Sequence, residues 1–179
     1  MPIVLISEFS PAALLAVRLW DPCRKEALRG HDWSFATVIK SLSTANYTIV
    51  ATDWDYAYQY PSDCLAMWHV YYNTRDKKQD FREVYDSVNA AKVILSNTAD
   101  AIGEFTFDLT TTTGYDANFV TVLSTLLASR MAKPLTGDDA LATKMTQVYT
   151  ALMSEAERMS SYENTPVTPP SSAFVDARS

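Results

Sequence analysis

The stretch DANFVTVLSTLLASRMAKPLTGDDALATKMTQVYTALMSEAERM, residues 116–159, decides the fold. In its first half apolar residues recur three and four positions apart, the spacing that lines one face of an α-helix. They are Phe119, Val122, Leu123, Leu126, Leu127 and Met131. Asp116 suits the N-cap of this helix. Pro134 predicts its end, because proline has no N–H to donate and clashes with the preceding turn.

A second helix is predicted to begin at Thr136 or Asp138. Its apolar stripe is Leu141, Met145, Val148, Leu152, Ala156 and Met159, and its polar face is Lys144, Gln147, Glu155 and Arg158. A connection as short as residues 134–137 forces two helices to pack antiparallel. We therefore expect a helical hairpin over residues 116–160, on which the rest of the chain packs.

Two more helices are predicted upstream, over about residues 11–42. Ser10 and Pro11 suit an N-cap and a first helical position, and one apolar face follows. That face is Leu15, Leu19, Cys23 and Ala27. Pro22 allows either a kinked continuous helix ending near Gly30, which we favour, or two shorter helices, the second capped by Asp21.

Asp32 is then expected to cap the next helix, with an apolar face of Phe35, Val38, Ile39 and Leu42. The sequence thus predicts four helices in two antiparallel pairs, a bundle-like core.

Between the pairs the pattern changes from helix to strand. Residues 43–62 are expected to form an aromatic loop, because no helical period lasts there and Pro61 forbids continuation. Alternating or β-rich runs predict strands in the following region, at residues 64–72, 81–85, 92–96 and 104–110. Polar turns of hairpin length separate them. An antiparallel β-meander at about residues 63–110, inserted between helical pairs, makes the fold class α+β within one domain, residues 1–164.

Residues 165–179 are rich in proline and serine and are expected to form an extended C-terminal arm. Two interpretations stay open. The arm is either a tail without a packed partner, or a peptide that docks on another subunit through Phe174, with Arg178 nearby. Truncation at Asn164 separates them, because only docking predicts lost assembly with unchanged folding.

Length, net charge, cysteine spacing and the lack of long apolar stretches exclude several classes of protein. With 179 residues and a formal net charge of −6, the chain is not built to neutralise phosphate or to lie on anionic lipid. Cys23 and Cys64 lack the spacing of a disulfide framework or zinc site, which favours a reducing compartment. No stretch is long enough to span a bilayer, and residues 1–6 lack the basic flank of a signal peptide. We expect a soluble intracellular protein.

Motifs of catalysis are not found. The chain has only two histidines, and it lacks the HExxH, GxSxG, GxGxxG and Walker patterns. His31 is expected to cap or turn, and His69 to pack within a strand. An enzyme would need His69 together with Asp63 or Asp108. We expect no enzymatic activity.

No metal site or cofactor is expected either. Asp53 and Asp55 have no EF-hand-like spacing after them to complete a calcium site. Asp138 and Asp139 suit the first turn of a helix, where the dipole favours carboxylates.

Aromatic residues with polar tips point toward binding. The chain has ten tyrosines and four tryptophans, and such residues are enriched in interfaces. The candidate interface residues are Trp54, Tyr56, Tyr58 and Tyr60 in the loop, and Phe174 and Arg178 in the arm. The alternative is that the loop aromatics only fill the gap between the meander and the helices.

Three separated stretches, in this order, resemble one known family. The first runs from Leu19-Trp20-Asp21 through Arg24 to His31-Asp32-Trp33-Ser34-Phe35-Ala36. The second is Trp54-x-Tyr56-Ala57-Tyr58-x-Tyr60-Pro61-x-Asp63-Cys64-Leu65. The third runs from Phe119 to Pro134 and on through Leu135-Thr136-Gly137. Together they are similar to the tail tubular protein A, or head-to-tail adaptor, family of short-tailed bacteriophages.

The resemblance implies a virion structural protein, made in the host cytoplasm, without catalytic activity. Members of this family form a dodecameric ring, bind the portal protein on one side and the tail nozzle, tubular protein B, on the other, and leave a channel for DNA ejection. An acidic chain would suit such a channel, because few cations give DNA little to bind. The competing hypothesis is a cytoplasmic small-ligand-binding or regulatory domain, with a pocket between sheet and hairpin lined by Met67, Phe105 and Phe107.

Overall fold

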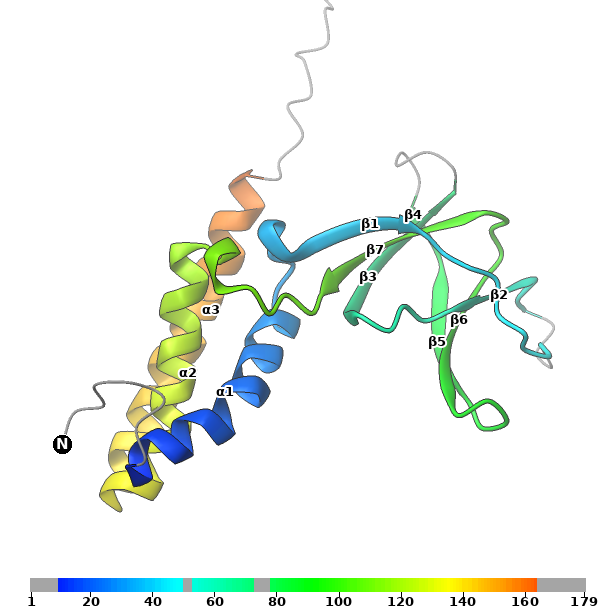
Figure 1. Ribbon diagram of the computed structural model, residues 1–179. Coiled ribbons are helices and arrows are strands. Elements are labelled where there is room, and N and C mark those ends of the chain that lie inside the picture. Colours follow the sequence, from blue (N-terminus) through cyan, green and yellow to red (C-terminus); the bar gives the residue numbers. More distant parts are fainter. Residues whose placement is uncertain (1–9, 50–52, 73–77, 164–179) are drawn as a thin grey trace, which may run out of the picture.

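The computed structural model describes residues 10–49, 53–72 and 78–163 (Figure 1). The protein is α+β, as predicted: its helices lie side by side at one end and its antiparallel strands form the other. In the described residues the α-helices are α1 (Pro11–Arg29), α2 (Ala117–Thr136) and α3 (Asp139–Glu163). The predicted arm, residues 165–179, lies outside the described residues.

Helix α1 begins and ends where the sequence indicates. The Ser10 hydroxyl accepts a hydrogen bond from the backbone N–H of Ala13 at 3.2 Å, and Pro11 is the first helical residue. The helix runs on through Pro22 to Arg29, and the N–H of Gly30 donates to the carbonyl of Glu26. One continuous helix is therefore confirmed over two shorter ones.

The hairpin of α2 and α3 is also confirmed, but its turn differs from the prediction. Helix α2 passes Pro134 and ends only before Gly137, whose φ is 72°. Proline removes a single backbone hydrogen bond so close to a helix end, and its ring is exposed here. The stop comes instead from the left-handed Gly137, whose N–H donates to the carbonyl of Lys133 at 2.9 Å.

The buried face of α3 is rotated from the predicted stripe. Met153 and Ala156 are buried and Tyr149 packs beside them, whereas Val148 and Met159, both in the predicted stripe, are exposed. The rotation arises because α3 packs on two partners at once. Besides α2, it contacts the end of α1, where the Met153 Cε would lie 2.7 Å from a Cβ placed on Gly30.

The predicted helix after Asp32 is wrong. Residues Ser34–Ala36 form a short 3-10 helix, η1, and Thr37–Ser41 form strand β1. Two consecutive β-branched residues, Val38 and Ile39, favour a strand, and β7 (Ala101–Phe107) provides its hydrogen-bonding partner. Asp32 accepts a hydrogen bond from the Thr37 hydroxyl at 2.6 Å and caps no α-helix.

The strands form two antiparallel sheets, so the single meander is also wrong. The remaining strands are β2 (Tyr56–Gln59), β3 (Cys64–Tyr72), β4 (Lys78–Gln79), β5 (Phe81–Asp86) and β6 (Ala91–Ser96). Their orders are β1-β7-β3-β4 and β2-β6-β5. The range predicted for β3 is correct, but β2 occupies the expected aromatic loop, and β7 starts and ends three residues before the predicted range.

Bent strands join the two sheets on both sides. After β1, the Leu42 N–H donates to the Ala101 carbonyl, whereas the Ala45 N–H donates to the Ala57 carbonyl of the other sheet. On the other side only Asp80 separates β4 from β5. Strands that change sheets in this way make the corners of a barrel-like sandwich. Its interior is Leu42, Tyr58, Met67, Val70, Ile94, Ala101 and Phe105.

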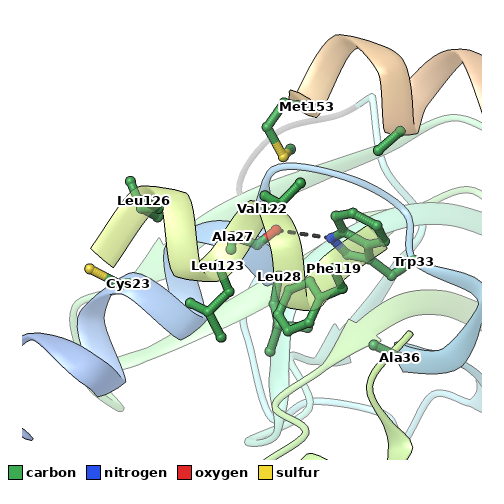
Figure 2. Close-up of a cluster of buried hydrophobic side chains, with 11 residues drawn as sticks. Cys23, Ala27, Leu28, Trp33, Ala36, Phe119, Val122, Leu123, Leu126 and Met153 are labelled. Carbon is green, nitrogen blue, oxygen red and sulfur yellow. Dashed lines mark hydrogen bonds between the residues drawn. The ribbon is translucent and has the colours of Figure 1, made fainter. Parts of the chain in front are cut away.

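A second core lies between the helices (Figure 2). Trp33 lies at one end of this core: its indole N–H donates to the Ala27 carbonyl at 3.0 Å, and its ring meets that of Phe119 edge-on, with centroids 5.2 Å apart. Other members are Cys23, Leu28, Val122, Leu123, Leu126, Met153 and Ala156. Helix α1 and the Trp33 segment thus pack on the hairpin, as predicted, but most strand residues pack in the barrel and not on the hairpin, so the expectation for the rest of the chain is wrong.

The hairpin turn gives a direct test of backbone strain. Gly137→Ala should lower the free energy of unfolding by about 1 kcal/mol, because a side chain there is forced into the left-handed region with nothing within 4 Å to clash or pack. Urea unfolding measures the change. Gly114→Ala is the matched control, since its Cβ would meet Leu109 at an ordinary 3.4 Å; an equal loss at both positions would contradict the strain at Gly137.

Candidate functional site

Tyr58, one of the predicted interface residues, lies inside the barrel. It is 1% exposed, its hydroxyl donates to the Thr98 carbonyl at 2.5 Å, and it pairs across the sheet with Ile94. This side chain is therefore a core residue and not an interface residue, but it fills the interior of the barrel and not the gap between strands and helices that the sequence left as the alternative. Strand alternation puts Ala57 on the opposite face and Tyr56 on the same face as Tyr58, and Tyr56 differs in being the first residue of β2.

Trp54 and Tyr56 lie at the start of this strand in different surroundings. Trp54 is half-buried against the other face of the sheet, where it packs beside Tyr47 and Ile49 over Val93. Tyr56 is 40% exposed, and its ring stacks on that of Tyr58 with centroids 6.5 Å apart. Of the described candidates, Tyr56 offers the most surface to a partner.

Tyr60 sits at the rim of the barrel. The Lys92 Nζ lies 4.8 Å from the centre of its ring, and both line a concave site of about 300 Å³ with Gln59, Asn46 and Asn89. Burial raises the pKa of Tyr60 and raises that of the neighbouring Cys64 to about 11. Both groups are therefore protonated at neutral pH and supply neither a base nor a thiolate.

The arm residues Phe174 and Arg178 lie outside the described residues. Their predicted role stays a prediction.

The sequence analysis missed an ion cluster that connects the helices to the sheets. Arg24 on α1 is only 1% exposed. Its guanidinium donates to the Asp108 carboxylate at 2.5 Å, to the Leu109 carbonyl at 2.8 Å, and to Asp21 one turn earlier at 3.0 Å. We call Arg24, Asp21, Asp108 and Leu109 the Arg24 joint.

The Arg24 joint satisfies a buried charge with oxygens from two parts of the chain. Asp108 and Leu109 directly follow β7, so the joint fixes the exit of the barrel against α1. The Tyr115 hydroxyl also donates to the Leu109 carbonyl, at 3.0 Å, which ties the approach to α2 to the same point. The hydrogen bond from Arg24 lowers the pKa of Asp21. The spacing Asp21-x-x-Arg24 was the available signal, since acids and bases three apart meet on a helix.

His69 and Asp108, one of the pairs that an enzyme would need, are not brought together. His69 pairs across the sheet with Glu104, and its Nε2 lies 2.7 Å from Lys78 Nζ. Asp108 is four residues further along the chain from Glu104, or about 13 Å at strand spacing, and is held by Arg24. His31 lies edge-on to Trp33, and burial lowers its pKa.

The described residues contain no group of three or more metal-ligating side chains. No helix among them has the length and apolar character to cross a membrane. Met67 and Phe105, expected to line a ligand pocket beside the hairpin, pack inside the barrel.

Comparison with known proteins adds no relative: no protein-family model matches the chain, and no curated protein matches it significantly.

Replacing Tyr58 and Tyr56 one at a time distinguishes a core tyrosine from a surface tyrosine. Tyr58→Ser should lower the free energy of unfolding by about 3 kcal/mol, because it empties a large buried site. Tyr56→Ser should change it by less than about 0.5 kcal/mol. Thermal and urea unfolding of both variants measure this; similar losses would show that Tyr56 is also a core residue.

The Arg24 joint predicts that breaking a buried ion pair destabilises the protein more than breaking an exposed one. Asp108→Asn should cost about 2 kcal/mol of unfolding free energy, because it leaves a buried guanidinium short of one charge; Asp108 itself is partly exposed, which limits the loss. The control is Glu155→Gln, which breaks an exposed pair with Arg158 on α3 and should change stability little. Equal effects in urea unfolding would contradict a special role for the joint.

Proposed function

We propose that the protein is a head-to-tail adaptor: a ring-forming structural protein of a short-tailed bacteriophage virion that links the portal to the tail nozzle. It acts by binding and not by catalysis. Its partners are further copies of itself, twelve in the resembling family, together with the portal protein and tubular protein B. DNA passes through the central channel.

The observation that carries the proposal is the convergence of the three family-like stretches. Arg24 and Trp33 come from the first stretch and Phe119 from the third, and Trp33 and Phe119 are neighbours in the helical core. Leu65, from the second, packs against this same core. Residues that are far apart in sequence but resemble one family therefore build one structural unit, which is what common descent of that unit would produce.

The shape and charge of the molecule suit the role. An α2–α3 hairpin of five or more turns, tied to a barrel through a buried ion cluster, gives a stiff subunit, and head-to-tail contacts of stiff subunits close into rings when the rotation permits. With 21 acidic against 15 basic residues, the chain offers DNA little counterion-release affinity, which favours sliding over binding.

The concave site beside Tyr60 and Lys92 supports the second candidate, a small-ligand-binding domain. Its aromatic ring, ammonium and amides, beside the carboxylate of Asp86, would suit a small polar ligand. This candidate predicts a monomer or dimer whose melting temperature rises with ligand.

Native mass distinguishes the two functions. The full chain is measured by light scattering on a sizing column, alone and after mixing with the portal protein of the same phage. An adaptor should form a ring alone or join the portal in a fixed ratio. A subunit that stays monomeric and ignores the portal would contradict the adaptor function. Tyr85→Ser, which changes an exposed side chain on β5, is measured in the same way as a control for the effect of altering a surface tyrosine.

A further inference from the structure

One face of α2 is exposed and carries no charge. Val120 is 49% exposed, Ser124 is exposed, and Leu127 and Met131 are half-buried. We call these four residues the α2 edge. The charged residues of α2 point elsewhere and are paired: Arg130 with Glu26 and Lys133 with Asp139, each at 2.8 Å.

A matching face lies on α3. Thr143, Gln147, Thr150 and Ser154, all exposed, form what we call the α3 edge. Both edges have the same 4-3-4 residue spacing, the pattern that one helix presents to another helix in knobs-into-holes packing.

The two edges point in opposite directions. At 3.6 residues per turn, the α2 edge lies away from Asn118 and Val122, which face α3 across a groove that Leu152 and Ala156 also line. By the same geometry the α3 edge lies away from Leu152 and Ala156. One edge is thus on the left of the hairpin and the other on its right.

Three hydroxyls of the two edges can lose water at low cost. The Ser124 hydroxyl donates to the Val120 carbonyl at 2.7 Å, and the Thr143 and Thr150 hydroxyls donate to the carbonyls four residues before them at 2.9 and 3.1 Å. A hydroxyl already bonded within its own helix leaves no unsatisfied donor when a partner covers it.

We infer that the α2 edge of one copy docks on the α3 edge of the next. Charge favours a second copy as the occupant, because chains of net charge −6 repel each other and neither edge itself carries a charged side chain. The cyclic arrangement rests on the proposed adaptor function. Left-to-right contacts of this kind are heterologous, so they propagate from copy to copy until a ring closes.

The size of the edges sets the strength of the contact. A face from Val120 to Met131 is roughly 17 Å long and roughly 10 Å wide. The resulting area is far below the roughly 800 Å² per partner of a stable pair. Two copies alone are therefore weakly held, and the contact is maintained in an assembly where every copy uses both edges.

The positions of residues along the two helices, counted from the hairpin turn, identify the side chains that meet. Ser124 and Thr150 are both thirteen residues from Gly137, so they lie at the same level of the hairpin. In a ring whose axis follows the hairpin, the α2 of one copy runs antiparallel to the α3 of the next. Ser124 of one copy then faces Thr150 of its neighbour.

Disulfide trapping tests this contact in the full-length protein. Equal amounts of S124C and T150C are mixed at high concentration, oxidised mildly, and run on a non-reducing gel. The mixed dimer should form at least about tenfold more than in S124C mixed with T143C, which lies on the same edge but about 10 Å away along the helix. The double variant S124C/T150C should give a ladder beyond the dimer.

Two results would overturn the inference: equal cross-linking with T150C and T143C, or S124C forming a dimer by itself as readily as in the mixture, which would mean an α2–α2 contact. The portal-binding measurement is independent. A chain that joins the portal without the specific cross-link would keep the adaptor function and lose this contact. A specific cross-link in a chain that does not bind the portal would support this contact and contradict the adaptor function.

Discussion

The position of the barrel relative to the helices depends on one buried guanidinium. Arg24 is nearly inaccessible to water, and a buried charge is tolerated only when oxygens surround it. Two of those oxygens, from Asp108 and Leu109, come from the segment between β7 and α2. Removing them would leave the charge unsatisfied, so the segment is held where the helical core needs it, and α2 starts in register with Trp33.

The sequence predicts the elements whose causes are local. The caps at Ser10 and Asp116, the start of the second hairpin helix near Asp138 and the range of β3 are correct, because capping oxygens and strand composition act over a few residues. It fails where distant partners decide. Val38 and Ile39 fit a helical spacing and a strand equally well, and only β7, more than sixty residues later, makes them a strand.

The same limit applies to the candidate site. Tyr56 and Tyr58 lie two residues apart and share one face of β2, and both pair with β6. Only Tyr58 is covered by the rest of the barrel, so the sequence could not separate it from Tyr56. The face of α3 is another example: its apolar residues span a broad arc, and contacts with α2 and the end of α1 select Met153 over Val148. The Arg24 joint was hidden because Asp108 and Leu109 lie 84 and 85 residues after Arg24 in the sequence.

The corners of the barrel have a consequence for the protein at high local concentration. An open sheet ends in a row of unpaired backbone groups, which another chain can extend strand by strand into an aggregate. Here the chain after β1 bends across to pair with β2, and β4 continues into β5, so the sheets are joined at these two corners, while β1 and β5 each pair with one strand only. The corners thereby shorten the strand edge that a crowded second copy could extend, which disfavours edge-to-edge aggregation.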